Sequence, residues 1–199
     1  MLKKTLILTN SSLTHIEESE SFRRFLQSGG FEAEIFLVDD GRHATRQFGL
    51  QKIVQLINFK KIKRLLSVIL SGSVSTVLVT APLPMVLILI PFLKRKKVKL
   101  VYTFHEPFMP DRKALYYRLT DFYHSFLVPK VDDLLFYSQN ALTLYREHNP
   151  TSSIPCHLIP LYKYRILIDK VSDIQQRKFI SFIGNMGSNK DLKKFFDIA

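Results

Sequence analysis

The sequence predicts an α/β protein with a Rossmann-like, doubly wound parallel sheet and flanking helices. Two observations carry this prediction. Short runs rich in β-branched and aromatic residues alternate with amphipathic stretches of helical period, which is typical of successive βαβ units. Several of the short runs, such as Val77-Leu78-Val79, are apolar at every position, as expected of parallel strands that are covered on both faces.

The first part of the chain contains two strand–helix pairs. The apolar run Thr5–Leu8 predicts a strand, and the amphipathic stretch Ser19–Gln27 predicts a helix. This helix is expected to end at Ser28-Gly29-Gly30, because glycine commonly follows the last helical residue. A second strand is expected at Glu34–Val38, and a second helix at Leu50–Leu70, where apolar residues recur with helical spacing.

The middle of the chain holds its longest apolar segment. No charged residue occurs between Val77 and Leu93, and prolines interrupt the segment. A membrane-spanning helix needs about 20 apolar residues. We therefore expect a buried strand at Thr76–Val79, a proline-rich turn and a buried helix at Pro84–Leu93, with a membrane-embedded segment as the alternative.

Two further strand–helix pairs follow. A strand is expected at Leu100–Phe104 and a helix at Lys113–Leu127, and the next strand at Leu134–Tyr137. Ser138 is placed to cap a helix at Ala141–Glu147, because serine after a strand can accept a hydrogen bond from the first helical turn.

The chain is expected to divide into three parts. Residues 1–160 form the Rossmann-like domain, and the charged, non-periodic stretch 161–177 reads as an interdomain linker. Residues 178–199 begin a second domain with a strand at Phe179–Ile183. Because the sequence stops within the helix expected after that strand, we expect this second domain to be incomplete.

The amino-acid composition limits the class of protein to which the chain can belong. Of the 199 residues, 46% are hydrophobic and 23% are charged, which is typical of a globular chain. The single cysteine, Cys156, excludes an internal disulfide framework and fits a reducing compartment. The apolar run at Leu6–Leu8 is too short for the core of a secretory signal. The formal net charge of +12 favours anionic partners.

Several common site motifs are absent from the sequence. It has no GxGxxG after the first strand and no GxxxxGK[ST], so neither a tightly held dinucleotide nor a P-loop nucleotide is expected. It also lacks GxSxG and HExxH, and we expect no metal site and no cofactor. Nucleic acid is not an expected partner, because no helix-turn-helix, zinc-finger or RNP pattern accompanies the positive charge.

A basic cluster lies within the second predicted helix. Its cations fall opposite the apolar positions, and such a helix can lie on an anionic bilayer. A solvated helix face is the equally weighted alternative. The cationic residues of this expected membrane surface are Lys60, Lys61, Lys63 and Arg64.

His105 and Glu106 follow the strand Leu100–Phe104 and are the most suggestive pair for chemistry. Parallel strands deliver such residues to the carboxyl edge of a sheet, where ligands bind. An imidazole there can bind a hydroxyl or exchange a proton; a histidine that only ends a strand is the alternative. The remaining histidines are expected on the surface or on helix faces: His15, His43, His124, His148 and His157.

In combination, four segments resemble a GT-B glycosyltransferase of the family 4 type, over the N-terminal domain and the first βα unit of the C-terminal one. Val77-Leu78-Val79 with its proline-rich turn is similar to the family's third βα unit, and Leu100–Glu106 to its "vyt-H-D/E" strand end. Val131–Ser138 resembles the strand that leads into a capped helix. Phe182–Lys190 resembles the "F-x-G-R-x-x-x-x-K" segment, with Asn185 in place of the arginine.

This resemblance implies roles for individual residues. Catalysis would involve His105 and Glu106, and Lys190 would stabilise the leaving diphosphate of a nucleotide sugar. Asn185 replaces the family's charged arginine, so one phosphate contact is lost or supplied elsewhere. The residues implied on the donor-phosphate side are Gly184, Asn185 and Lys190, and those on the acceptor side are Asn10, Ser11, Ser12 and Ser138.

The resemblance implies a retaining glycosyltransferase without an essential metal. It would be cytoplasmic, peripheral on the inner membrane face, and would transfer sugar to a glycan or lipid-linked acceptor in polysaccharide or glycolipid synthesis. This partial chain would be inactive alone. Two alternatives stay open: a non-catalytic truncated module that binds anionic membrane or a partner subunit through its basic helices, and a flavodoxin-like small-ligand domain.

Overall fold

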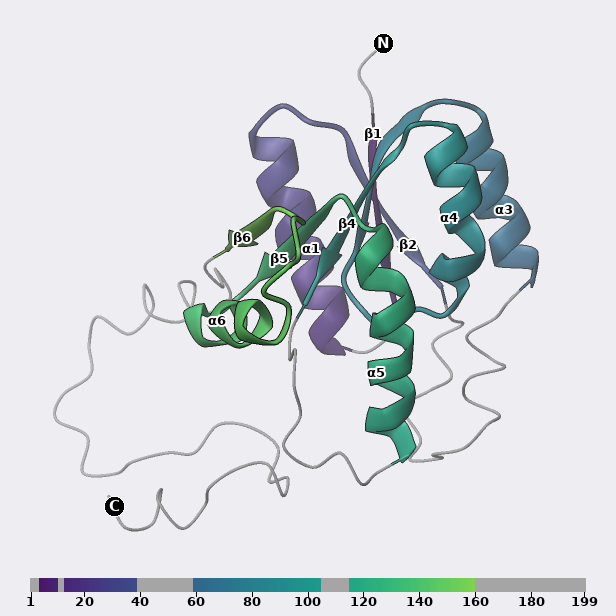
Figure 1. Ribbon diagram of the computed structural model, residues 1–199. Helices are drawn as coiled ribbons and strands as arrows, with labels where there is room; N and C mark the ends of the chain where they lie inside the picture. The colour runs from purple at the N-terminus through teal and green to yellow at the C-terminus, as the bar shows by residue number, and fades with distance from the viewer. Residues whose placement is uncertain (1–3, 11–12, 39–58, 105–114, 160–199) are drawn as a thin grey trace, which may run out of the picture.

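The computed structural model of the protein describes residues 4–10, 13–38, 59–104 and 115–159 (Figure 1). Within these ranges, the strands form one six-stranded sheet in the order β2-β1-β3-β4-β5-β6, and every neighbouring pair is parallel. The strands are β1 (Lys4–Thr9), β2 (Ala33–Leu37), β3 (Val74–Val79), β4 (Lys99–Thr103), β5 (Asp133–Phe136) and β6 (Cys156–Leu158).

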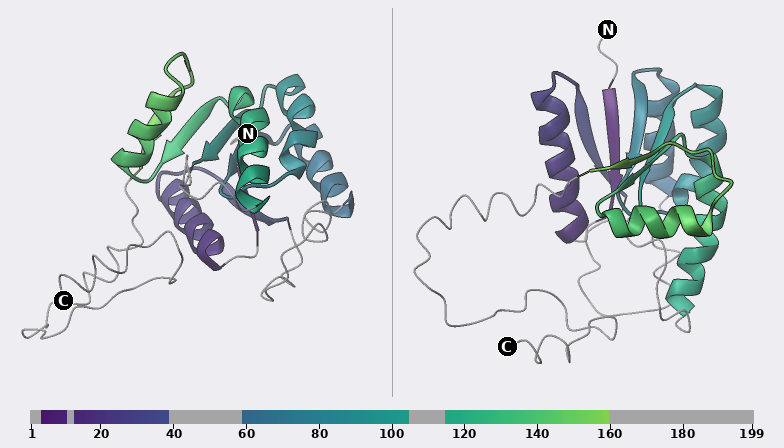
Figure 2. Two further views of the ribbon diagram at one scale, coloured as in Figure 1. Left: turned by 60° about the horizontal axis from the view of Figure 1, so that its bottom comes forward. Right: turned by 60° about the vertical axis from the view of Figure 1, so that its left-hand side comes forward.

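The helices connect these strands and cover both faces of the sheet. Figure 2 shows α1 on one face and α3, α4 and α5 on the other. The fold is therefore the doubly wound, Rossmann-like α/β arrangement that the sequence predicts. The helices are α1 (Leu13–Ser28), α3 (Phe59–Leu70), α4 (Met85–Arg95), α5 (Leu115–Leu127) and α6 (Gln139–His148), with a 3₁₀ turn at Val128–Lys130.

The two faces of the sheet differ in how they are filled. The face under α3–α6 carries the large core, which includes the fully buried Leu8, Leu65, Leu89 and Phe136. The face under α1 carries a much smaller apolar cluster. Its buried members are Ile7, Ala33, Leu78, Val101 and Leu135.

The apolar segment in the middle of the chain is part of the large core. β3 is followed by a proline-rich turn and then by α4, whose inner side is buried, as predicted. None of the described helices is long and apolar enough to cross a membrane.

Helix ends follow the expected chemistry. α1 ends at Ser28, and Gly30 takes a left-handed conformation with φ 79°. The amide of Phe31 then donates to the Leu26 carbonyl at 3.0 Å, which satisfies a carbonyl at the helix end. α5 ends at Leu127, and Pro129 lies in the following 3₁₀ turn.

Three elements differ from the sequence prediction. β6 was not predicted, because three residues at the edge of a sheet carry little pattern. α1 begins at Leu13, well before the predicted start, because its first turns carry polar side chains. The second predicted helix is described only from Phe59 onward. The linker at 161–177 and the strand at Phe179–Ile183 lie outside the described residues.

Candidate functional site

A row of buried hydroxyls marks the carboxyl edge of the sheet. Thr9, Thr80 and Thr103 lie at the ends of the adjacent strands β1, β3 and β4, and each is 0% exposed. Strand alternation places all three on the face covered by α1, next to Ile7, Leu78 and Val101. Between β1 and β3 the chain direction across the sheet reverses, and ligands of open α/β sheets bind beyond the strand ends at such a switch point.

Helix α1 places Glu18 and Ser19 over this row of threonines. They lie on the same side of the helix as Phe22 and Leu26, which pack on the sheet. The hydroxyl of Ser19 donates to the carbonyl of His15 at 2.7 Å and lies 3.0 Å from the Thr80 hydroxyl. The row of strand ends and the first half of α1 therefore form one polar layer.

Glu18 is a buried carboxylate of this layer and is only 5% exposed. The hydroxyl of Tyr137, just after β5, donates to Oε1 of Glu18. Oε2 of Glu18 lies 3.4 Å from Nδ1 of His15, one turn earlier on α1. These contacts join α1 to the part of the chain that directly follows β5. We call Tyr137, Glu18 and His15 the edge triad.

Tyr137 is held in its neutral form. Burial and the negative charge of Glu18 raise the pKa of this phenol well above its ordinary value, against an opposing hydrogen bond with Thr103. A neutral phenol is a hydrogen-bond donor, and an ionised carboxylate is only an acceptor. The Tyr137 hydroxyl therefore supplies a hydrogen-bond donor to the buried Glu18 side chain.

Replacing Tyr137 with phenylalanine should leave the Glu18 carboxylate short of a donor. We expect a loss of about 1–3 kcal/mol in the free energy of unfolding, measured by urea denaturation. The control is Tyr145→Phe, since Tyr145 is buried and its hydroxyl contacts the neutral Ser152 hydroxyl at 3.0 Å. The control should cost about 0.5–1.5 kcal/mol. Equal losses in the two variants would contradict the assignment.

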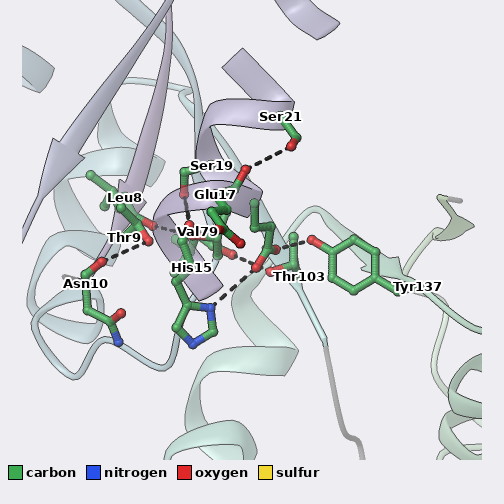
Figure 3. A network of polar contacts seen from close by, with 12 residues as sticks. Leu8, Thr9, Asn10, His15, Glu17, Ser19, Ser21, Val79, Thr103 and Tyr137 are labelled. Carbon is green, nitrogen blue, oxygen red and sulfur yellow. Dashed lines mark hydrogen bonds and ion pairs between the residues drawn. The ribbon is translucent and has the colours of Figure 1, made fainter. Parts of the chain in front are cut away.

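Two acceptor-side residues of the sequence prediction are described. Asn10 follows β1. Figure 3 shows that its side chain extends away from Thr103 and Tyr137, which lie at the other end of the polar layer. Ser138 follows β5 and accepts a hydrogen bond from the amide of Ala141 at 3.1 Å, which confirms it as the cap of α6. Both lie at the carboxyl edge, and their predicted contact with an acceptor stays a prediction. The other predicted site residues, Ser11, Ser12, His105, Glu106, Gly184, Asn185 and Lys190, lie outside the described residues.

The predicted basic helix has the expected two sides. Ile62, Leu65 and Ile69 of α3 are buried against the sheet. Lys60, Lys63 and Arg64 are exposed, Lys61 is half-buried, and the Arg64 guanidinium lies 5.8 Å from the centre of the Phe36 ring. Phe59, at the start of the helix, is 78% exposed.

Sequence reasoning missed the edge triad. The signal was present, because Glu18 has helical spacing from Phe22 and Leu26 and therefore faces the sheet. The histidines also differ from one another. His15 lies on a helix face, as predicted, but His124 turns toward the core, where its Nε2 lies 2.8 Å from the Tyr102 hydroxyl.

In the described part of the chain, no three histidine, cysteine, aspartate or glutamate side chains are grouped to hold a metal ion. Within the edge triad, Tyr137 and Glu18 already bond to each other, and the His15 side chain is 21% exposed.

No family model matches the chain, and no curated protein matches it in sequence. Among solved structures, 18 chains match. One is the LacI family transcriptional regulator CCPA from Weissella paramesenteroides with bound glucose: 9% identity, TM-score 0.38, covering 68% of this chain and 58% of that one. Another is Alr3699/HepE of Anabaena in complex with UDP and glucose: 10% identity, TM-score 0.44, covering 85% of this chain and 50% of that one. The chain thus spans about half the length of these two structures, and neither likeness carries an argument.

Proposed function

We propose that this chain forms the acceptor side of a glycosyltransferase, which transfers sugar from a nucleotide diphosphate sugar to a hydroxyl of a glycan or lipid-linked acceptor. The observation that carries the proposal is the edge triad with its row of threonines at the switch point of a doubly wound sheet. Ligands of open α/β sheets bind at this edge, and an imidazole such as that of His15 can hydrogen-bond to a ligand that presents hydroxyl groups.

The donor side of the proposal comes from the sequence resemblance. Gly184, Asn185 and Lys190 would contact the donor diphosphate, and the positive charge of Lys190 would stabilise the leaving group. His105 and Glu106 follow β4, which ends beside the edge triad, and they would approach the donor sugar. In this scheme the reaction is retaining and needs no metal.

The acceptor is proposed to lie close to a membrane. Lys60, Lys63 and Arg64 of α3 are exposed, and α4 ends in Lys94 and Arg95, followed by Lys96 and Lys97, with Lys94 paired to Asp132. An anionic bilayer attracts such residues by about 1 kcal/mol each near the surface. The exposed Phe59 supplies an apolar side chain beside these cations. The protein would then act at the inner face of the membrane.

Donor binding and turnover test the proposal. The chain, and the complete gene product if it is longer, are titrated with UDP-glucose, UDP-N-acetylglucosamine and GDP-mannose by calorimetry, and release of nucleotide is followed. Lys190→Ala should weaken donor binding by about 10–100-fold, the size of a lost charged hydrogen bond. Lys130→Ala is the control, because Lys130 is exposed and contacts only the Phe126 carbonyl and ring among the described residues. Absence of binding and turnover with every donor refutes the proposal.

Co-sedimentation with vesicles separates the enzyme from the non-catalytic alternative. Vesicles of phosphatidylglycerol and phosphatidylcholine are compared with pure phosphatidylcholine. Binding to the anionic vesicles together with donor turnover supports the proposed enzyme. Binding without turnover of any donor favours the module that docks on membranes.

A further inference from the structure

Helix α4 departs from the rule that a helix at the surface turns polar side chains to solvent. Every residue from 85 to 93 is apolar. The inner side of the helix is buried in the large core, but on its outer side Ile88 is 44% exposed and Pro91 is exposed as well. Leu87 and Phe92 lie beside them and are half-buried. These four side chains are neighbours at helical spacing, and we call them the outer stripe.

The neighbouring helix α3 shows that the fold does not impose such a stripe. α3 and α4 pack side by side on the same face of the sheet (Figure 2). Ile62 and Leu65 of α3 are buried, whereas Lys63, Arg64 and Ser67 are exposed. A helix in this layer can therefore present a polar outer side, and α4 does not. Adjoining apolar side chains at a surface mark a place where another molecule binds.

Cations follow directly on the outer stripe. Arg95, Lys96 and Lys97 are exposed, and none of them forms an ion pair with another described residue. Lys94, one position earlier, is paired with Asp132 at 2.7 Å. We call Arg95, Lys96 and Lys97 the basic turn. An apolar stripe that continues into unpaired cations is complementary to a surface with negative charge outside and hydrocarbon inside.

The backbone of the basic turn gives a second reason to assign it a use. Lys97 has φ 54°, in the left-handed region, and it is the one described residue other than glycine with a positive φ. It stands just after α4, where the amide of Val98 donates to the Leu93 carbonyl at 2.9 Å. Glycine is the usual residue at this place in such a helix end, because a side chain there costs stability. A lysine at this position therefore does not serve the fold.

We propose that α4 docks the protein on an anionic lipid bilayer, with the outer stripe inserted among the lipids and the basic turn against their phosphates. The inference rests on the proposed function, since it names the surface by which the chain would reach a lipid-linked acceptor. With 11 residues α4 is too short to cross a bilayer and lies along its surface. Because α4 follows β3, its first turn is at the carboxyl edge of the sheet, which stays next to the lipids.

Charge favours a lipid surface over a second copy of this chain. The formal net charge is +12, so two copies that meet through their outer stripes repel each other. An anionic bilayer attracts the basic turn and also accepts the apolar side chains. An acidic protein offers the same charge, and the experiment below includes a probe for it.

Insertion of α4 can be measured directly, because the chain contains no tryptophan. Ile88→Trp places a single indole on the outer stripe. Phe25→Trp is the control, because Phe25 is 62% exposed on α1, which covers the opposite face of the sheet (Figure 2). On vesicles of phosphatidylglycerol and phosphatidylcholine, the emission of Ile88→Trp should move to shorter wavelength and be quenched by lipids brominated on their acyl chains. The emission of Phe25→Trp should not change. Unchanged emission of Ile88→Trp overturns the inference.

Lys97→Gly separates binding from folding. It removes one cation and places glycine where the left-handed backbone favours it, so the temperature of unfolding should stay equal or rise. Affinity for the anionic vesicles should fall about 5-fold, and about 100-fold when Arg95→Gln and Lys96→Gln are added. Arg24→Gln, an exposed position on α1, is the control for net charge and should change affinity little. Equal losses in Lys97→Gly and Arg24→Gln would show that the basic turn is not the contact.

The outcomes distinguish this inference from the proposed function. Insertion of Ile88→Trp without turnover of any donor supports docking through α4 and refutes the glycosyltransferase. Turnover without insertion refutes docking through α4 and leaves the glycosyltransferase standing. Polyglutamate is the probe for an acidic protein. If polyglutamate shifts the emission of Ile88→Trp and anionic vesicles do not, the outer stripe binds protein and the inference is wrong.

Discussion

Replacing Leu89 with alanine is expected to lower the free energy of unfolding by about 2–5 kcal/mol. Leu89 lies in the middle of α4 and is 0% exposed, within the large core between the helix and the sheet. The substitution removes apolar contacts and leaves a cavity that neighbouring side chains fill only in part. Urea denaturation followed by circular dichroism measures the loss.

The adjacent residue provides the control for Leu89→Ala. Ile88 is on the outer side of the same helix and is 44% exposed. Ile88→Ala should cost about 1 kcal/mol or less, because surface positions seldom contribute more. If both variants lost the same stability, α4 would not be docked on the sheet as described.

Acidification between pH 6.5 and pH 4 is expected to destabilise the protein through His124. Its ring packs 4.6 Å from the centre of the Phe104 ring, and burial lowers its pKa to about 4. The unfolded chain binds a proton near pH 6.5, where the folded protein does not. Stability from this residue is therefore complete above pH 6.5 and falls as the pH drops toward 4, by up to about 3 kcal/mol.

The variant His124→Gln should flatten this dependence. It removes the titrating group and keeps a side chain that can hydrogen-bond to Tyr102. Asp132 affects the stability of the protein at a lower pH than His124 does. Its pKa is lowered although burial alone would raise it, because the Leu100 amide and Lys94 stabilise the charge, so its contribution is lost only below about pH 4. An unchanged slope between pH 4 and 6.5 in His124→Gln would contradict the role of His124.

The sequence predicts most of the sheet because its strands are apolar on both sides. The apolar runs in β1, β3, β4 and β5 predict strands of a parallel sheet with little ambiguity. The glycines after α1 and Ser138 before α6 mark the ends of those helices. The edge strand β6 is short and largely exposed, and its sequence pattern does not differ from that of a loop. Its pairing with β5 comes from position in the fold, which local sequence does not encode.

The candidate site is harder to predict than the sheet. A strand end such as Tyr137 can be assigned to the carboxyl edge from sequence, but its contact with Glu18 spans more than 100 positions of chain. That contact depends on how α1 crosses the sheet, which is a tertiary property. The histidines show the same limit. His15 and His124 both lie on helices, and only their packing in the fold shows that His15 belongs to the candidate site and His124 to the core.

The position of β1 has a consequence for how the chain assembles. β1 precedes the other described strands along the chain, yet it lies inside the sheet, with β2 on one side and β3 on the other. Its second edge stays unpaired until residues 74–79 have left the ribosome, and later strands then add outward in order. A pause in translation before β3 would therefore hold the nascent protein with an open, aggregation-prone strand edge.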